Sequence, residues 1–352
     1  MKEFDVIIIG GGQSALACAY FLRRTDLSYT ILDDQSLPGG AWQHVWDSLT
    51  LFSPSEYSSL PGWMMPKSES NFPSKDEVIS YLTVYEERYK IPVCRPVEVK
   101  AVHHTRHSFE LDTSVGGYRC KALISATGNW HHPYIPEITG RGEYSGIEIH
   151  SAYYKNADNL KGKKVLIVGN GNSGAQILAE VSKVASTVWA VQKAPEYLPD
   201  EVDGRVLFDI ASAKYHALQA GKEFDAKQYS LGNIVMVPSV VDARERDVLH
   251  YRKTFHAMTP TGVIWEDGNS EDFDVIIWCT GFKPAFDHLK SLDIMDDQQQ
   301  IETTETESNA IPGLYLVGYG NKTGFASATL IGVGRSARNT INQITAYLKQ
   351  TK

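Results

Sequence analysis

The chain has 352 residues, the length of about two domains at roughly 150 residues each. Its 34 Lys and Arg against 42 Asp and Glu give a formal charge of −8. This balance argues against a nucleic-acid partner, which requires a basic face. The four Cys exclude a disulfide-stapled scaffold and include no CxxC pair. Because no signal peptide or run of ~18 apolar residues is present, we expect a cytoplasmic protein without a membrane partner.

The N-terminal segment predicts a strand, a glycine turn, a helix and a second strand. Residues 6–9 are a β-branched run typical of a central parallel strand. Gly10-Gly11-Gly12-Gln13-Ser14-Ala15 follows, then a predicted helix over 16–24 and a strand over 29–32 that ends at Asp33. This order is typical of one half of a Rossmann-like fold.

The same order begins again in the middle of the chain. A predicted strand over 165–168 leads into Gly169-Asn170-Gly171-Asn172-Ser173-Gly174. A helix over 175–183 and a strand over 187–191, which ends at Gln192-Lys193, come next. We therefore predict an internal repeat of the dinucleotide-binding unit.

The remaining elements lie between and after these two units. Residues 77–89 predict a helix, and 93–124 predict an antiparallel meander that runs into Ala126-Thr127-Gly128. A strand over 274–278 runs into Cys279-Thr280-Gly281, and a strand over 314–317 ends at Gly318-Tyr319. We expect a helix from about residue 326, and a solvated loop or hairpin over 296–308. The fold class is therefore α/β, with two Rossmann-like domains.

The two glycine turns predict two dinucleotide sites. The first Gly makes the turn, the second lets the pyrophosphate approach the backbone, and the third position must be small for helix packing. The helix N-terminus offers free N–H groups to the phosphates. Asp33 stands about 20 residues after the first turn, where an acid accepts hydrogen bonds from both ribose hydroxyls. The alternative at each turn is an α/β protein that binds nothing there.

The second site has no such acid. Its strand ends at Gln192 and Lys193. A cation attracts the 2′-phosphate of NADPH, whereas a neutral amide can bind the bare ribose of NADH. We therefore predict weak discrimination between NADPH and NADH, with a solvated surface lysine as the alternative for Lys193.

Two dinucleotide sites in one chain predict FAD at the first and NAD(P)H at the second, with hydride transfer between them. No nucleophile elbow, HExxH motif or metal-spaced Cys and His set is present. His103-His104-x-x-His107 has a spacing that could hold a metal, but neighbouring residues of a strand point to opposite faces. We therefore predict no metal site.

The segment between the glycine turns carries a family resemblance. Tyr144 to Tyr154, with Gly146 and His150, matches the pattern FxGxxxHxxx(Y/F). It resembles the fingerprint of class B flavin-containing monooxygenases, with Tyr for Phe at the first position. Baeyer–Villiger enzymes usually have Trp where this chain has Tyr154. Gly39-Gly40-Ala41-Trp42 also resembles the GGxW segment of that family. The resemblance covers essentially the whole chain and is strongest to short bacterial members of the Stenotrophomonas maltophilia type, which use NADPH or NADH.

The resemblance implies an NAD(P)H-binding domain of residues 151–274 inserted into an FAD-binding domain of residues 1–150 and 275–352. It implies a flavin-dependent monooxygenase in which NAD(P)H reduces FAD and O2 gives a C4a-(hydro)peroxyflavin. That species would oxygenate small sulfides (sulfoxidation) and ketones (Baeyer–Villiger reaction). An NAD(P)H oxidase or flavin reductase that releases hydrogen peroxide, and a flavin-binding redox sensor without turnover, stay open as alternatives. By analogy with the family we expect a homodimer.

Two departures from the family pattern concern the flavin. Phe52, with Ser53 beside it, stands where larger members carry an Asn, and Tyr319 replaces the Asp that many flavoproteins have after Gly318. The resemblance assigns a catalytic place to Phe52 and Ser53, and to His150 a structural or nicotinamide-positioning role. The residues expected at FAD are Gly10, Gly12, Gln13, Ser14, Asp33, Gly40, Ala41, Trp42, Val99, Ala126, Thr127, Gly128, Gly318 and Thr329. The residues expected at NAD(P)H are Gly169, Gly171, Asn172, Ser173, Gly174, Gln192, Lys193, Thr280 and Gly281.

Overall fold

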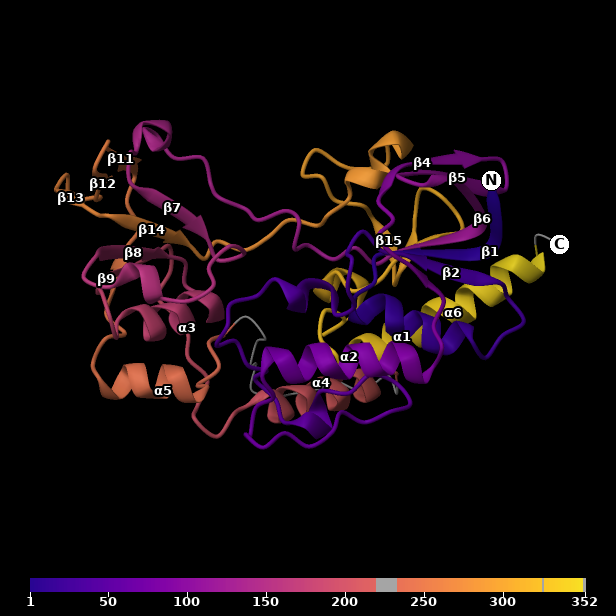
Figure 1. Ribbon diagram of the computed structural model, residues 1–352, viewed down its shortest axis with the longest axis horizontal. Helices are drawn as coiled ribbons and strands as arrows, with labels where there is room; N and C mark the ends of the chain where they lie inside the picture. Colours follow the sequence, from indigo (N-terminus) through magenta and orange to yellow (C-terminus); the bar gives the residue numbers. More distant parts are fainter. Residues whose placement is uncertain (220–232, 325, 351–352) are drawn as a thin grey trace. The chain divides into compact units, whose positions relative to one another are not determined.

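The computed structural model describes residues 1–219, 233–324 and 326–350 (Figure 1). The chain divides into two compact units. Unit 1 comprises Met1–Gln43, Pro54–His132 and Pro284–Lys352, and unit 2 comprises His44–Ser53 and Pro133–Lys283. Residues 133–150 and 275–283, expected in the FAD-binding domain, lie in unit 2 because their strands pair within its sheet. The chain also enters unit 2 over His44–Ser53, which local pattern did not indicate.

The main sheet of unit 1 has the order β15-β16-β17-β6-β1-β2-β3. Strands β1, β2, β3, β6 and β17 pair in parallel, as the β-branched run of residues 6–9 predicts for a central strand. The strands of this unit are β1 (Lys2–Ile9), β2 (Tyr29–Leu32), β3 (Val93–Cys94), β4 (Val99–Thr105), β5 (Ser108–Thr113), β6 (Gly116–Ser125), β15 (Thr303–Thr304), β16 (Glu307–Ser308) and β17 (Leu314–Leu316).

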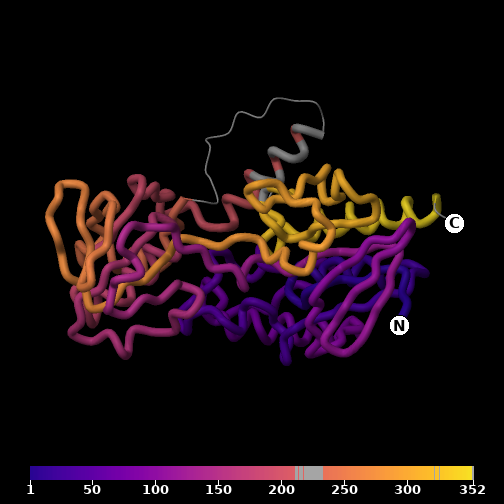
Figure 2. The backbone as a smooth tube through the Cα atoms, turned by 90° about the horizontal axis from the view of Figure 1, so that it is seen from above, coloured from indigo at the N-terminus to yellow at the C-terminus, as the bar shows by residue number. Residues whose placement is uncertain are grey.

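The expected meander forms strands β4, β5 and β6, which pair antiparallel and can be followed in Figure 2. The acidic stretch 296–308 contains the short hairpin β15–β16. Both features follow from alternation and turn residues in the local sequence.

The helices of unit 1 are α1 (Gln13–Leu22), α2 (Lys75–Arg88) and α6 (Val333–Gln350), and α1 packs against α6 (Figure 1). Helix α2 begins at a capping box, in which Ser74 accepts from Glu77 N and Glu77 accepts from Ser74 N. The expectation of a helix from about residue 326 was wrong, because Ala326 has φ +57° and cannot continue an α-helix. The Thr329 hydroxyl donates to Ala326 O (2.7 Å), which holds this turn ahead of α6.

Unit 2 contains a parallel sheet in the order β10-β9-β8-β14-β7 and a small antiparallel sheet β11-β12-β13. Its strands are β7 (Ile147–His150), β8 (Lys164–Val168), β9 (Ser186–Val191), β10 (Tyr251–Lys253), β11 (Ala257–Met258), β12 (Gly262–Ile264), β13 (Ser270–Asp272) and β14 (Val275–Trp278). Its helices are α3 (Asn172–Val181), α4 (Gly204–Gln219) and α5 (Pro238–Glu245). Short 3-10 helices of the two units span Gly40–Gln43, Ser55–Tyr57, Arg141–Glu143, Asp158–Leu160, Asp287–Leu292 and Gly320–Thr323.

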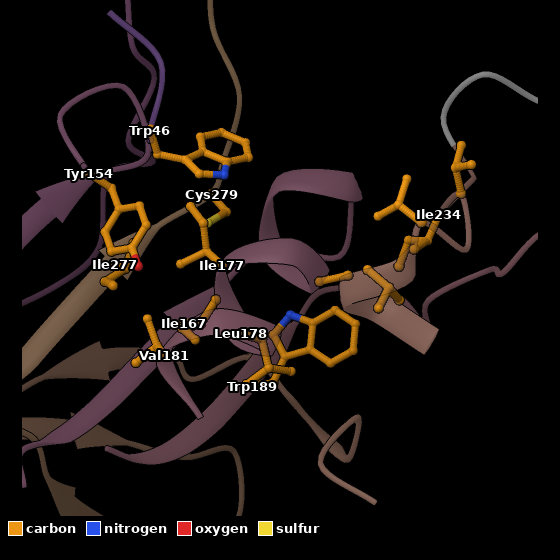
Figure 3. Packing of buried hydrophobic residues seen from close by; sticks show 14 of the residues in the cluster. Trp46, Tyr154, Ile167, Ile177, Leu178, Val181, Trp189, Ile234, Ile277 and Cys279 are labelled. Carbon is orange, nitrogen blue, oxygen red and sulfur yellow. The ribbon is translucent and has the colours of Figure 1, made fainter. Parts of the chain in front are cut away.

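The core of unit 2 explains why residues 44–53 belong to it. Figure 3 shows Trp46, Tyr154 and Cys279 grouped with Ile177 of α3. Trp46 is 6% exposed, and its burial removes a large apolar area from water. Backbone N–H of Asp47 also donates to Lys155 O (2.8 Å). In the part of the chain that is described, no helix has the length and apolar character to cross a membrane.

Candidate dinucleotide sites and the segment between them in sequence

The first glycine turn lies in unit 1 between β1 and α1. A Cβ at Gly10, which has φ +96°, would lie 2.7 Å from Ala126 O, so this position requires Gly. A Cβ at Gly12 would meet no atom within 4 Å, so the turn is open on that side. Helix α1 has no side-chain cap, which leaves N–H groups of its first turn for an anion. The turn therefore fits a pyrophosphate.

Asp33 lies against this turn at the end of β2. A Cβ at Gly11 would be 2.1 Å from Asp33 Oδ2, so the carboxylate contacts the turn directly. Arg95 Nε donates to Asp33 Oδ2 at 2.6 Å. Burial raises the pKa of the Asp33 carboxyl, and the guanidinium of Arg95 opposes this shift. A buried acid beside the glycine turn suits recognition of a nucleotide ribose.

The GGxW segment packs over the same turn. Gly40 approaches so closely that a Cβ there would lie 2.8 Å from Gly12 Cα. Trp42 Nε1 donates to Gln13 Oε1 at 3.1 Å, and Gln13 Nε2 donates to Ala328 O at 2.7 Å. Two segments that are distant in sequence are thus brought to the start of α1. Ser14 is brought to Gly318 as well, since a Cβ at Gly318 would lie 2.1 Å from Ser14 Oγ.

Tyr319 has a role that the sequence did not indicate. Its hydroxyl accepts from Thr127 N (3.2 Å) and lies 2.8 Å from both Thr127 Oγ1 and Ser125 Oγ. Because Thr127 Oγ1 donates to Ala285 O, it must accept from the Tyr319 hydroxyl. Ser125 Oγ in turn lies 3.1 Å from His288 Nε2. Tyr319, which stands where many flavoproteins have an acid, therefore fixes the first threonine–glycine segment.

Burial keeps His288 neutral at ordinary pH, because it lowers the pKa of the imidazole to about 4.

Val99, also expected at FAD, begins β4 and pairs with Thr113 of β5. Gly128 has φ +65°, which favours Gly, and its carbonyl accepts from Ala285 N at 2.9 Å.

The second glycine turn lies in unit 2 between β8 and α3. A Cβ at Gly169 would lie 2.2 Å from Cys279 O, and one at Gly174 would lie 2.3 Å from Gly169 O. A Cβ at Gly171 would meet nothing within 4 Å, and α3 has no side-chain cap. This turn therefore has the same open side and the same uncapped helix start as the first, and it fits a second pyrophosphate.

Four other residues expected at NAD(P)H lie in three different surroundings. Gln192 and Lys193 are exposed where β9 ends, at the carboxyl edge of the sheet where ligands of such folds bind. Asn172 is engaged with the protein instead, since its Oδ1 accepts from Val235 N (2.9 Å) and its Nδ2 donates to Asn233 O (3.0 Å). Ser173 is half-buried in the first turn of α3.

The second threonine–glycine segment pairs with residues 133–134. The Thr280 hydroxyl donates to Tyr134 O, and Tyr134 N donates to Gly281 O at 2.9 Å. Pro133 and Phe282 form an antiparallel bridge next to these bonds. The segments that follow 132 and precede 284, at two of the four places where the chain passes between the units, are thus joined within unit 2.

The fingerprint histidine is buried beside this pair of segments. His150 is 3% exposed, its Nδ1 accepts from Ala152 N (3.1 Å), and Phe282 packs edge-on against its ring at 5.1 Å. Its Nε2 is a buried atom without a hydrogen-bond partner among the described residues. Burial lowers the pKa of His150, so the ring is neutral with the proton on Nε2.

Phe52 and Ser53 lie in unit 2, at the start of α4. Gly204 N donates to Phe52 O at 2.8 Å, and the rings of Phe52 and Phe208 are 6.0 Å apart. Ser53 is 3% exposed, and a Cβ at Gly204 would lie 2.6 Å from its Cβ. The segment that replaces the family's Asn is therefore packed on α4.

A metal centre has no support in the described ranges, where no group of three or more His, Cys, Asp or Glu side chains could hold an ion. His103 of the expected motif pairs instead with Asp112, with His103 Nε2 at 3.1 Å from Asp112 Oδ2. The four cysteines, all described, are free thiols.

The family model of pyridine nucleotide-disulphide oxidoreductases matches residues 7–318. The chain belongs to this family, as a class B flavin-containing monooxygenase. The solved flavin-containing monooxygenase from Stenotrophomonas maltophilia is 47% identical, with a TM-score of 0.91 over 99% of this chain and 100% of that chain. The Uncharacterized oxidoreductase CzcO of Bacillus subtilis is 31% identical over 97% of this chain and 99% of its own. Indole-3-pyruvate monooxygenase YUCCA4 of Oryza sativa is 25% identical over 99% of this chain and 89% of its own.

These likenesses agree with the two open glycine turns. The protein is a flavin-dependent monooxygenase that uses FAD and NAD(P)H. The resemblance to the short bacterial monooxygenases and the α/β fold with Rossmann-like domains are therefore confirmed.

Proposed function

We propose that unit 1 binds FAD, that unit 2 binds NAD(P)H, and that the enzyme oxygenates small sulfides to sulfoxides. The observation that carries the proposal is the pair of glycine turns, one in each unit, each with a second glycine at which a Cβ would meet no atom within 4 Å. Only the turn of unit 1 has a buried acid, Asp33, at the place of a ribose ligand. This difference supports FAD there and a nicotinamide nucleotide at the other turn.

FAD supplies the redox chemistry when it is bound, since it accepts hydride from NAD(P)H and activates O2. The chain's own residues bind and orient the two nucleotides. The first turns of α1 and α3 donate backbone N–H groups to the pyrophosphates. The contacts of Trp42 and Gln13 hold the start of α1 in place.

The overall reaction is balanced as sulfide, O2, NAD(P)H and a proton giving sulfoxide, water and NAD(P)+. A sulfide needs no general base, which agrees with a neutral, buried His150 that accepts a hydrogen bond from the backbone. Tyr154, where Baeyer–Villiger enzymes usually have Trp, supports sulfoxidation as the main reaction and ketone oxygenation as a secondary one. We assign His150 to positioning rather than to proton transfer.

Both nicotinamide nucleotides are proposed as reductants. Lys193 is exposed at the end of β9, where its charge can attract a 2′-phosphate, and neighbouring Gln192 can bind a ribose hydroxyl. Neither residue excludes either nucleotide.

A second candidate function is an NAD(P)H oxidase that releases hydrogen peroxide. Its support is Phe52, which stands at the position where larger members of the family carry an Asn. The Phe52 side chain packs on α4. A flavin-binding sensor is less well supported, because the second glycine turn keeps its open side.

The test measures NADPH consumption, sulfoxide formation and hydrogen peroxide release by the purified holoenzyme with NADPH and methyl phenyl sulfide in air. We expect sulfoxide in proportion to the NADPH consumed. Peroxide equal to the NADPH consumed, with no sulfoxide, identifies the oxidase, and no NADPH oxidation by FAD-loaded protein identifies the sensor. A parallel reaction with a cyclic ketone, followed by lactone analysis, measures the Baeyer–Villiger share. Light scattering tests the homodimer that family analogy implies.

A further inference from the structure

Asp33, Arg95 and Glu86 form a partly buried chain of ion pairs in unit 1 that no part of the mechanism above uses. Arg95 Nη1 and Nη2 donate to Glu86 Oε1 and Oε2 at 2.7 and 2.8 Å, and its Nε donates to Asp33 Oδ2 at 2.6 Å. The side chains of Asp33, Arg95 and Glu86 are 3%, 11% and 16% exposed. Glu86 lies on α2, and Arg95 directly follows β3.

The orientation of Arg95 is the informative feature. A guanidinium that meets one carboxylate usually takes both of its oxygens with two parallel N–H bonds. Here both terminal nitrogens are bound to Glu86, so Arg95 reaches Asp33 with Nε alone and contacts only Oδ2. The other oxygen, Oδ1, is 3.5 Å from Gln35 N, at the outer limit of a hydrogen bond, and keeps acceptor capacity.

We propose that Glu86 and Arg95 are positioning residues for the FAD ribose. Glu86 binds the two terminal nitrogens of Arg95, which form the fork of its guanidinium. Arg95 therefore contacts only one oxygen of Asp33 and leaves the other oxygen to the ribose hydroxyls. The proposal depends on the assignment of FAD to unit 1 made above. Without Glu86, the fork of Arg95 is released to take both Asp33 oxygens and to compete with the ribose. Without Arg95, Asp33 is a buried carboxylate that has lost its cation.

Arg95 has a second effect, on the charge of Asp33. Ribose hydroxyls donate hydrogen bonds, so they bind best to an ionised carboxylate. Burial favours the neutral acid, and Arg95 opposes this shift. The other titratable groups around the site are Asp34, next to Asp33, and His131 from the segment after Gly128, whose Nε2 lies 3.2 Å from Asp34 Oδ2.

The test is FAD release from the holoenzyme on dilution, followed by the rise in flavin fluorescence. Glu86→Gln should raise the Kd for FAD about threefold to tenfold, and Arg95→Gln about tenfold to a hundredfold. Arg95→Lys keeps the charge without the fork and should fall between wild type and Arg95→Gln. The matched control is Glu87→Gln, an exposed residue on the same helix, which should leave the Kd unchanged.

Dependence on pH separates positioning from a general loss of structure. In Arg95→Gln the pKa of Asp33 rises further, so the Kd for FAD should decrease as the pH is raised and the carboxylate regains its charge. In wild type the same decrease should lie at lower pH. A His131→Gln background removes the nearby histidine from the comparison. The KM for NADPH at saturating FAD should be that of wild type in every variant.

Asp33→Asn separates the positioning role of Glu86 and Arg95 from the assignment of FAD to unit 1. If Asp33→Asn weakens FAD binding while Glu86→Gln, Arg95→Lys and Arg95→Gln stay within twofold of wild type at every pH, the positioning role is wrong and the FAD assignment stands. If Asp33→Asn also leaves the Kd unchanged, both are wrong. Should Arg95→Gln fail to fold, Glu86→Gln and Arg95→Lys still decide between these outcomes.

Discussion

Tyr154 Oη donates a hydrogen bond to Glu180 Oε1 at 2.9 Å, which joins the last residue of the fingerprint to helix α3. Ser48 Oγ donates to the other oxygen of the same carboxylate. Glu180 therefore connects three parts of unit 2: the segment after β7, the segment 44–53, and the helix that follows the second glycine turn. The family pattern also permits Phe at this position, which has the ring but not the hydroxyl.

Tyr154→Phe should lower the free energy of unfolding by about 1–2 kcal/mol, because a buried hydroxyl bonded to a carboxylate is lost. Urea unfolding of the holoenzyme measures the change. Tyr153→Phe is the matched control, since Tyr153 is 67% exposed and should unfold like wild type. Equal stability of the two variants would show that the Tyr154–Glu180 bond contributes nothing net.

Gly146 of the fingerprint is required for packing. A Cβ there would lie 2.2 Å from Tyr144 Oη, and this hydroxyl cannot move freely because it donates to Phe273 O at 2.8 Å. Gly146→Ala should therefore cost about 1–3 kcal/mol of stability. Gly142→Ala, where a Cβ would meet nothing within 4 Å, should stay within about 1 kcal/mol of wild type. Thermal unfolding of both variants checks the difference, which is absent if Tyr144 relaxes.

Lys193→Ala should raise the KM for NADPH about threefold to tenfold and leave the KM for NADH within twofold, because only NADPH has the 2′-phosphate. Steady-state kinetics with both nucleotides measures the change. Lys161→Ala provides the control, since this exposed lysine precedes β8, at the sheet edge opposite to the carboxyl ends of the strands. A strong preference for NADH in wild type, unaltered in Lys193→Ala, would contradict the charge-based assignment.

His288 should make stability depend on pH. The pKa of its imidazole in the folded chain is about 4, below the ~6.5 of an unfolded histidine, so the unfolded state binds the extra proton. Stability from this group is complete above about pH 6.5 and decreases as the pH falls towards 4, by an amount of the order of 3 kcal/mol. Unfolding free energies measured between pH 7 and 5 should fall less steeply in His288→Gln than in wild type.

The control for this measurement is His107→Gln, an exposed histidine of the β4–β5 turn, which should keep the wild-type slope. Parallel slopes for His288→Gln and wild type would mean that the pKa of His288 is the same in the folded and the unfolded chain.

Much of the fold could be read from the order of residues, because its signals are local. A β-branched run followed at once by a glycine turn and a helix needs no distant partner to be recognised, so both dinucleotide-binding units, the meander and the late strands were predicted. Gly12 and Gly171 were expected to be open, and a Cβ at either would meet nothing within 4 Å. Gly128 and Gly281, which end the two threonine–glycine segments, have positive φ.

What could not be read are contacts between residues far apart in the chain. The entry of residues 44–53 into unit 2 depends on Trp46 packing beside Tyr154, and the start of α6 at Val333 depends on the turn at Ala326. No periodicity or motif in the sequence indicates the hydrogen-bond partners of the Tyr319 hydroxyl and the Arg95 guanidinium. Local propensity and spacing specify strands, helices and turns, whereas burial and hydrogen bonding across long loops depend on which surfaces the folded chain brings together.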